Sequence, residues 1–197
     1  INHSQLRGYK DGKLSWEIKS KHIRSSRNKY LFNAEQIYDG KLFNNNKVVV
    51  NNIQAEKIKV NSKSKTFFAE NNVQLSFFKE NRKETDPPIK IACKKFNYFE
   101  YTHKSYLYED IQITHKDLII KPLKNIEIDH NKNLVMINNG YHIETNTFFV
   151  SGNNMIIDID KEEAILDQGL TIKNKIDNLD FSNLDERERA IREKKST

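Results

Sequence analysis

The sequence has little of three residue types that shape many folds: 197 residues include one cysteine, three prolines and six glycines. Because Cys93 is the single cysteine, an intramolecular disulfide is excluded. The cysteine count therefore does not identify whether the protein works in an oxidising or a reducing compartment. Few prolines and glycines, with abundant Asn, Lys, Ile, Phe and Tyr, favour long β-strands joined by polar turns. No apolar run reaches the roughly 18 residues that a membrane-spanning helix needs.

The motifs that would identify an enzyme are also missing. The sequence has no Gly-rich phosphate loop, no G-x-S-x-G and no H-E-x-x-H, and its six histidines lack close metal-ligand spacing. Asp158 and Asp160 alternate with isoleucines, which indicates the wet face of a strand and not a calcium loop. Cys93 stands in phase with Ile89 and Ile91, which predicts a packing residue and not a nucleophile. We therefore expect no catalysis, no cofactor and no metal.

The charge is moderately basic, with 33 Lys and Arg against 27 Asp and Glu. These charges are interspersed, which is typical of a solvated surface, although a basic surface also attracts anionic partners such as phosphorylated lipid or nucleic acid. Residues 94–101 mix basic and aromatic side chains, as in a platform that stacks bases. Packing inside a sheet explains such aromatics better, so nucleic acid is the weaker alternative and not an expected partner.

Alternating apolar residues dominate the rest of the sequence and predict an all-β fold. Residues 48–78 show the pattern best, because Val73, Leu75 and Phe77 share one phase between polar neighbours. Asp-Gly pairs at 11–12 and 39–40, and polar residues at 44–46 and 130–133, predict turns. Residues 79–88 are charged and end in two prolines, which predicts an exposed loop.

A weak repeat runs through the chain at intervals of about thirty residues, a spacing typical of stacked supersecondary units. In each unit a strand is followed by a polar pair and then by another strand. The pairs are residues 71–72, 109–110, 138–139 and 167–168. A unit of this kind cannot bury its apolar face alone, so stacking must create the core.

The sequence divides into a polar, flexible lead-in at 1–10, a β-domain at 11–176 and a charged helical tail at 177–197. Ser182 is placed to cap the tail helix, and Asp185–Arg189 and Glu188–Arg192 are favourable i,i+4 pairs. The tail has a thin apolar seam, which favours a solvated, frayed segment; docking on a partner is the alternative.

Three segments of the sequence are similar to elements of one family. Residues 9–20 are similar to its opening element, and residues 53–58 together with 69–75 are similar to its recurring sequence pattern. The chain, from about residue 9 to 174, resembles the OstA-like proteins of lipopolysaccharide transport, either LptC-like or LptA-like. It departs from the family's G-N-V element, since Asn71, Glu109 and Asn138 stand where the family has glycine. The insertion that ends in two prolines is a second departure.

The resemblance implies an open V-shaped β-jellyroll of stacked short antiparallel strands. It also implies a non-enzymatic periplasmic module of the cell envelope that carries lipopolysaccharide or a related glycolipid between the inner and outer membranes. Expected partners are other jellyroll proteins of a transport bridge and an inner-membrane ABC transporter complex, with self-association through sheet edges. The sequence starts at Ile1, so we expect a trimmed product whose inner-membrane tether is missing from this chain.

Alternation assigns a set of residues to the apolar groove between the two sheets. The groove set is Trp16, Ile18, Phe32, Val50, Phe67, Val73, Leu75, Ile91, Phe96, Tyr98, Ile111, Ile126, Ile128, Met136, Phe148, Val150, Ile157 and Leu166. The sheet edges that meet partners are expected at the first and last strands, with the residues Leu14, Trp16, Ile18, Ala164, Leu166, Leu170 and Ile172. The alternative function is a structural or adhesive β-solenoid without lipid cargo.

Overall fold

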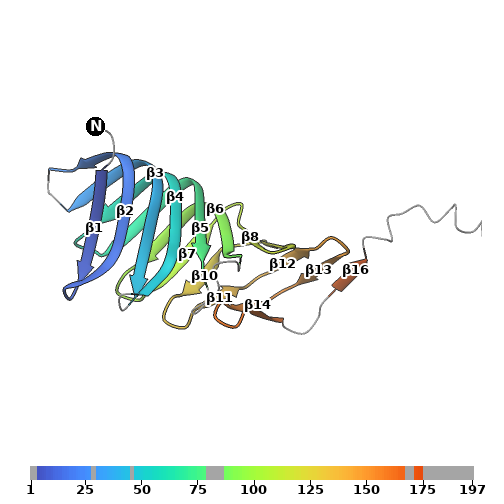
Figure 1. The fold of residues 1–197 in the computed structure, drawn as a ribbon. Coiled ribbons are helices and arrows are strands. Elements are labelled where there is room, and N and C mark those ends of the chain that lie inside the picture. The colour runs from blue at the N-terminus through green and yellow to red at the C-terminus, as the bar shows by residue number, and fades with distance from the viewer. Residues whose placement is uncertain (1–3, 28–29, 45–46, 79–86, 167–170, 175–197) are drawn as a thin grey trace, which may run out of the picture.

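The computed structural model describes residues 4–27, 30–44, 47–78, 87–166 and 171–174, and every regular element in these ranges is a β-strand (Figure 1). The strands are β1 (Ser4–Lys10), β2 (Lys13–Ser25), β3 (Leu31–Asn44), β4 (Lys47–Asn61), β5 (Thr66–Phe77), β6 (Ile89–Phe99), β7 (Lys104–Tyr108), β8 (Gln112–His115), β9 (Leu118–Pro122), β10 (Ile126–Asp129), β11 (Leu134–Ile137), β12 (Tyr141–Glu144), β13 (Phe148–Gly152), β14 (Met155–Asp158), β15 (Glu163–Leu166) and β16 (Thr171–Asn174). The expected helical tail at 177–197 lies outside the described residues, as do residues 79–86 of the expected loop.

The predicted all-β, open jellyroll-like fold is confirmed. The strands form one large antiparallel sheet that does not close into a barrel. β1 to β6 pair in chain order, and the sheet then divides, because one end of β6 pairs with β7 and the other end with β8. We call the strands β7, β10, β11, β14 and β15 the β7 branch, and the strands β8, β9, β12, β13 and β16 the β8 branch.

The described polar pairs of the sequence repeat lie where the chain bends, within the long strand β5 or between one branch and the other. Asn71 and Asn72 have φ of 61° and 49° in the middle of β5, and Glu109 and Asp110 have 60° and 51° between β7 and β8. Asn139, between β11 and β12, has φ of 70°. Asn and Asp tolerate this left-handed conformation better than most residues, which suits Asn71, Asn72, Asp110 and Asn139 to these bends. Gly140 follows Asn139 with φ of 104° and completes the third bend. The fourth pair, at 167–168, lies outside the described residues.

The sheet folds into two layers that face each other, and hairpin tips of one layer contact hairpin tips of the other on the side opposite the bends. Lys10 Nζ lies 3.2 Å from His103 Nε2, and the Asn44 amide donates to Asn131 Oδ1 at 3.1 Å. Farther along, Lys116 lies 3.8 Å from Glu162. These polar contacts close the side of the molecule opposite the bends. The space between the two layers is the interior.

The expected flexible lead-in is wrong for most of its length, because Ser4–Lys10 form strand β1, paired with β2 from end to end. Leu6 packs against the core, and Gly8 lies directly below Trp16, where a Cβ atom would come within 2.1 Å of the indole ring. The apolar part of β1 is one leucine and one glycine, too little for the alternation pattern to detect.

Candidate functional site

Two unbroken rows of apolar side chains line the interior. Directly opposed residues of antiparallel strands point to the same face, so the pairing register gives each row. The first row crosses β3 to β7 and the β7 branch, and it consists of Ala34, Ile58, Ala69, Phe96, Leu107, Ile126, Ile137, Met155 and Leu166. The second row crosses β5, β6 and the β8 branch, and it consists of Leu75, Ile91, Ile113, Ile120, Ile143, Val150 and Ile172.

Most residues of the predicted groove set lie in this interior. Those that are buried are Trp16, Ile18, Val50, Phe67, Val73, Leu75, Ile91, Phe96, Tyr98, Ile111, Ile126, Ile128, Val150 and Ile157. Phe32 and Leu166 are partly buried against the same core. Phe148 is on the inner face, two residues before Val150, but it is 38% exposed because it begins β13, beside the turn from β12, whereas Val150 is 6% exposed.

Met136 was assigned to the wrong face. In β11 the buried residues are Val135 and Ile137, and Met136 pairs instead with Ile156, which is 39% exposed on the outer surface. Every residue of β11 is apolar, so alternation could not distinguish the two faces. The outer surface of the β7 branch therefore has an apolar strip of its own, which continues to Ile165 in β15.

The predicted edges are right at one end of the fold and wrong at the other. Leu14, Trp16 and Ile18 belong to β2, which pairs with β1 on one side and β3 on the other, so the edge strand is β1. At the C-terminal end, Ala164 and Leu166 lie in the edge strand β15, and Ile172 lies in the edge strand β16. Leu170 lies outside the described residues.

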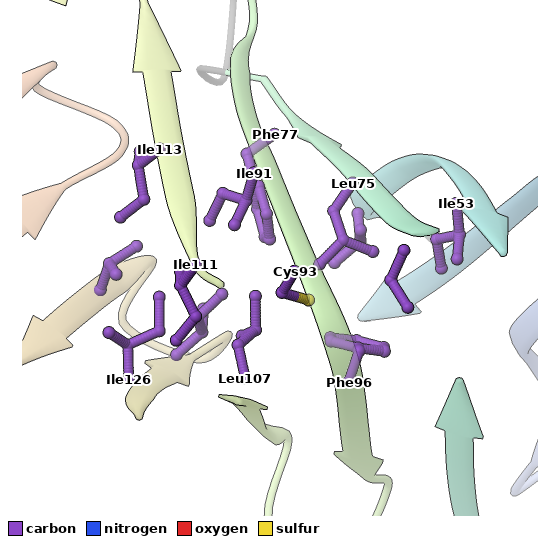
Figure 2. Packing of buried hydrophobic residues seen from close by; sticks show 14 of the residues in the cluster. Ile53, Leu75, Phe77, Ile91, Cys93, Phe96, Leu107, Ile111, Ile113 and Ile126 are labelled. Atoms are coloured by element: carbon purple, nitrogen blue, oxygen red, sulfur yellow. The ribbon is translucent and has the colours of Figure 1, made fainter. Parts of the chain in front are cut away.

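The middle of the interior is filled by side chains. Trp16 from β2 meets Phe67 edge to face, with ring centroids 6.4 Å apart, and Phe67 meets Phe96 in the same way at 6.1 Å. Figure 2 shows aliphatic and aromatic side chains from neighbouring strands gathered around Cys93 on β6. An apolar cavity between β8–β9 and β14–β15 has a volume of only about 50 Å³.

Cys93 is buried, as its phase predicted. Burial raises the pKa of the thiol to about 12, and a hydrogen bond to the Lys95 carbonyl, with Sγ and O 3.3 Å apart, offsets only part of this effect. A thiol with so high a pKa forms almost no thiolate at neutral pH, so it is a poor nucleophile.

Ser105 and His130 form a buried polar pair on the inner face of the β7 branch, and the sequence analysis did not predict it. His130 is 3% exposed, its Nε2 lies 2.6 Å from the Ser105 hydroxyl, and its ring stacks on Phe77 and meets Tyr98 edge to face. Burial, and then the nearby His103, lower the pKa of His130 to about 3. The serine and histidine resemble a nucleophile and its base, but Ser105 is completely buried. We interpret the pair as a satisfied core hydrogen bond.

Glu100 is a second buried polar residue that the sequence analysis missed. It is 1% exposed where the β6–β7 turn meets the β1–β2 hairpin. Burial raises the pKa of its carboxyl, while Lys65 and the Ser15 hydroxyl lower it to a smaller extent. Glu100 continues the inner phase of Phe96 and Tyr98, and this was the signal in the sequence that indicated its burial.

Comparison with known proteins adds no assignment: no protein-family model and no curated protein matches the chain. Within the described ranges no three His, Cys, Asp or Glu side chains come together as a metal site. The same part of the chain holds no helix with the length and hydrophobicity needed to cross a bilayer. The apolar interior and the sheet edges are therefore the features from which a function is argued.

Proposed function

We propose that this protein is a non-enzymatic lipid-transport module of the OstA-like type. In this proposal the acyl chains of lipopolysaccharide or a related glycolipid lie against the apolar inner faces, and the polar sugars and phosphates stay in water. The module works in the periplasm, tethered to the inner membrane. The energy for transport comes from an ABC transporter.

The observation that carries the proposal is that the second apolar row ends uncovered at the C-terminal edge, at Ile172. Ile172 ends the second row and is 67% exposed, Phe148 beside it is 38% exposed, and Leu166 ends the first row partly buried. An alkyl chain placed over these side chains gains about 0.8 kcal/mol for each CH₂ removed from water. The rows would then continue the apolar surface inward from the point of entry.

The size of the interior determines how such a cargo could enter. The apolar cavity of about 50 Å³ holds no acyl chain, and the rings of Trp16, Phe67 and Phe96 pack against one another in the middle. Larger and more polar hollows of about 250 and 360 Å³ lie beside Trp16 and Phe32 and beside Val48, Phe78 and Ile159. In this proposal the cargo first contacts the exposed C-terminal end, and farther passage requires the two layers to separate. The packed middle favours the second candidate, a structural β-solenoid with a dry core.

The edge strands support the assembly part of the proposal. β1 ends the sheet on one side, and β15 and β16 end the two branches on the other. Edge strands present unpaired N–H and C=O groups that accept a further strand. Partner jellyrolls joined at these edges would extend both apolar rows.

The test is photocrosslinking at two neighbouring residues of β13. Phe148 faces the interior and Phe149 faces outward, yet their exposures are nearly equal at 38% and 37%. A benzophenone amino acid is placed at either position, and the folded protein is irradiated with lipopolysaccharide or with total membrane glycolipid. We expect lipid adducts from position 148 several times more often than from position 149. Equal labelling, or no adduct with any lipid, would replace the proposal with the structural β-solenoid.

A further inference from the structure

The hollow of about 250 Å³ beside Trp16 combines apolar walls with two opposite charges. Strands β1 and β2 contribute Leu6 and Trp16 to its wall, and Phe32 from the start of β3 lies across from them. Lys65 from the β4–β5 turn and Glu100 from the β6–β7 turn line the same hollow. An apolar pocket with a few convergent polar groups is the usual form of a small-molecule site.

The Glu100 carboxyl is buried and lacks a hydrogen-bond partner. Glu100 is 1% exposed, and neither of its carboxyl oxygens accepts a hydrogen bond from any described residue. The Ser15 hydroxyl lies close enough to lower the pKa of this carboxyl, but it too is buried without a partner that meets hydrogen-bond geometry. A buried carboxylate without a donor costs much free energy, and buried polar groups are normally paired. The missing donor is therefore expected on a bound molecule.

The positive charge next to Glu100 does not pair with it directly. The backbone N–H of Glu100 donates to the Lys65 carbonyl, with N and O 3.0 Å apart, so the two residues are adjacent. Lys65 Nζ bonds instead to the carbonyl oxygen of Tyr9, at 3.2 Å. An ammonium group has three donors, so Lys65 keeps donors for a ligand. The hollow thus presents an acceptor and a donor of opposite charge that are not bonded to each other.

We propose that this hollow binds a small zwitterion, with the ligand's primary ammonium on Glu100 and its anionic group on Lys65. The short carbon chain between the two charges lies against Trp16 and Phe32. A ligand with a positive charge alone is repelled by Lys65, and a ligand with a negative charge alone is repelled by Glu100. The hollow is smaller than a pocket for a drug-sized molecule, which limits the ligand to a few carbon atoms. A partner strand would pair with the backbone edge of β1, so the two sites use different groups.

The experiment titrates the full chain with 5-aminopentanoate, and with pentanoate and pentylammonium, which each carry one of its two charges. Trp16 is the single tryptophan and lines the hollow, so its fluorescence reports binding, and calorimetry measures the same affinities independently. We expect 5-aminopentanoate to bind at least tenfold more tightly than either compound with one charge. Equal affinities for the three compounds would overturn the proposal.

Two variants test the two charges separately. Glu100→Gln and Lys65→Met should each weaken binding of 5-aminopentanoate at least tenfold, and Lys65→Met should also tighten binding of pentylammonium at least threefold. The matched controls are Glu144→Gln and Lys121→Met, which remove the same charges from an exposed ion pair of β12 and β9 with Oε2 and Nζ 3.3 Å apart. The fluorescence maximum of Trp16 without ligand shows whether each variant keeps the fold, and Lys65→Met in its turn provides the test if Glu100→Gln does not fold. Equal losses in the controls, or unchanged affinity in Lys65→Met, would contradict the site.

The same two charges occur in phosphoethanolamine, which exists both as a free compound and as a lipid headgroup. Binding of the free compound would identify a soluble ligand. Binding only to phosphatidylethanolamine in phosphatidylcholine vesicles, abolished by Glu100→Gln, would identify a membrane lipid. Binding of neither, with no binding of 5-aminopentanoate, would reject the site. The hollow lies apart from Phe148, where lipid transport is tested by photocrosslinking, so each proposal can fail without the other.

Discussion

His130 should make the stability of the fold depend on pH in a way that can be calculated. Its pKa is about 3 in the folded protein, against about 6.5 in an unfolded chain. The unfolded state therefore binds more protons between these two values, and the free energy of unfolding falls as the pH falls through this window. From pH 7.5 to pH 5.0 the loss due to His130 is about 2 kcal/mol, since each pH unit below 6.5 contributes about 1.4 kcal/mol.

The assay is urea unfolding followed by the fluorescence of Trp16, the single tryptophan, which is 7% exposed. The comparison is with His130→Gln, whose amide can keep the bond to Ser105 without titrating. The variant is expected to be less stable at pH 7.5, because it loses the stacking on Phe77. The difference between the two proteins should shrink by about 2 kcal/mol at pH 5.0. Glu100, whose pKa is raised, contributes with the opposite sign in both proteins and cancels. A difference that stays constant from pH 7.5 to 5.0 would refute the reasoning.

Two further predictions test the packing. Gly8→Ala should destabilise the protein by about 1–3 kcal/mol, because its Cβ would lie 2.1 Å from the Trp16 ring, and should shift the fluorescence of Trp16 to the red. Gly12→Asn in the same hairpin is the control, since no atom lies within 4 Å of its Cβ position and Asn tolerates its φ of 75°; an equal loss there would argue against a steric cause. Cys93, whose thiol is buried with a pKa of about 12, should react with iodoacetamide only in denaturant. Rapid labelling of the folded protein at pH 8 would contradict its placement.

The fold class could be predicted because a sheet with one solvent-exposed face has apolar and polar residues in alternation along each strand. The same logic identified the polar pairs at 71–72 and 109–110, although not their role as bends. It failed where the two faces are chemically alike, as at Met136, and where a turn signal has another cause. Asp39-Gly40 predicted a turn but lies within β3, where Gly40 leaves room for Ile53, whose Cβ would lie 3.0 Å from an added Cβ.

The candidate site was predicted in part. Side chains that are apolar and in phase, such as Phe67 and Leu75, are buried where alternation placed them. His130 was missed because its turn position was predicted correctly, yet the side chain turns inward to meet Ser105. Phe148 is exposed although it shares the inner phase of the buried Val150, because it begins β13 beside a turn, and alternation does not show where a strand starts.

The division of the sheet after β6 has a consequence for how the molecule comes apart. β3, β4 and β5 each cross both layers, so neither layer can open there without disturbing the other. Beyond β6 the chain alternates between the two branches. Each successive strand pair is hydrogen-bonded only to neighbouring strands of its own branch. Hydrogen exchange should therefore be graded, fastest at β16 and β15 and slower hairpin by hairpin toward β6. Natural length variants of such a chain would gain or lose strands from this end, in alternate layers, while the region from β1 to β6 stays intact.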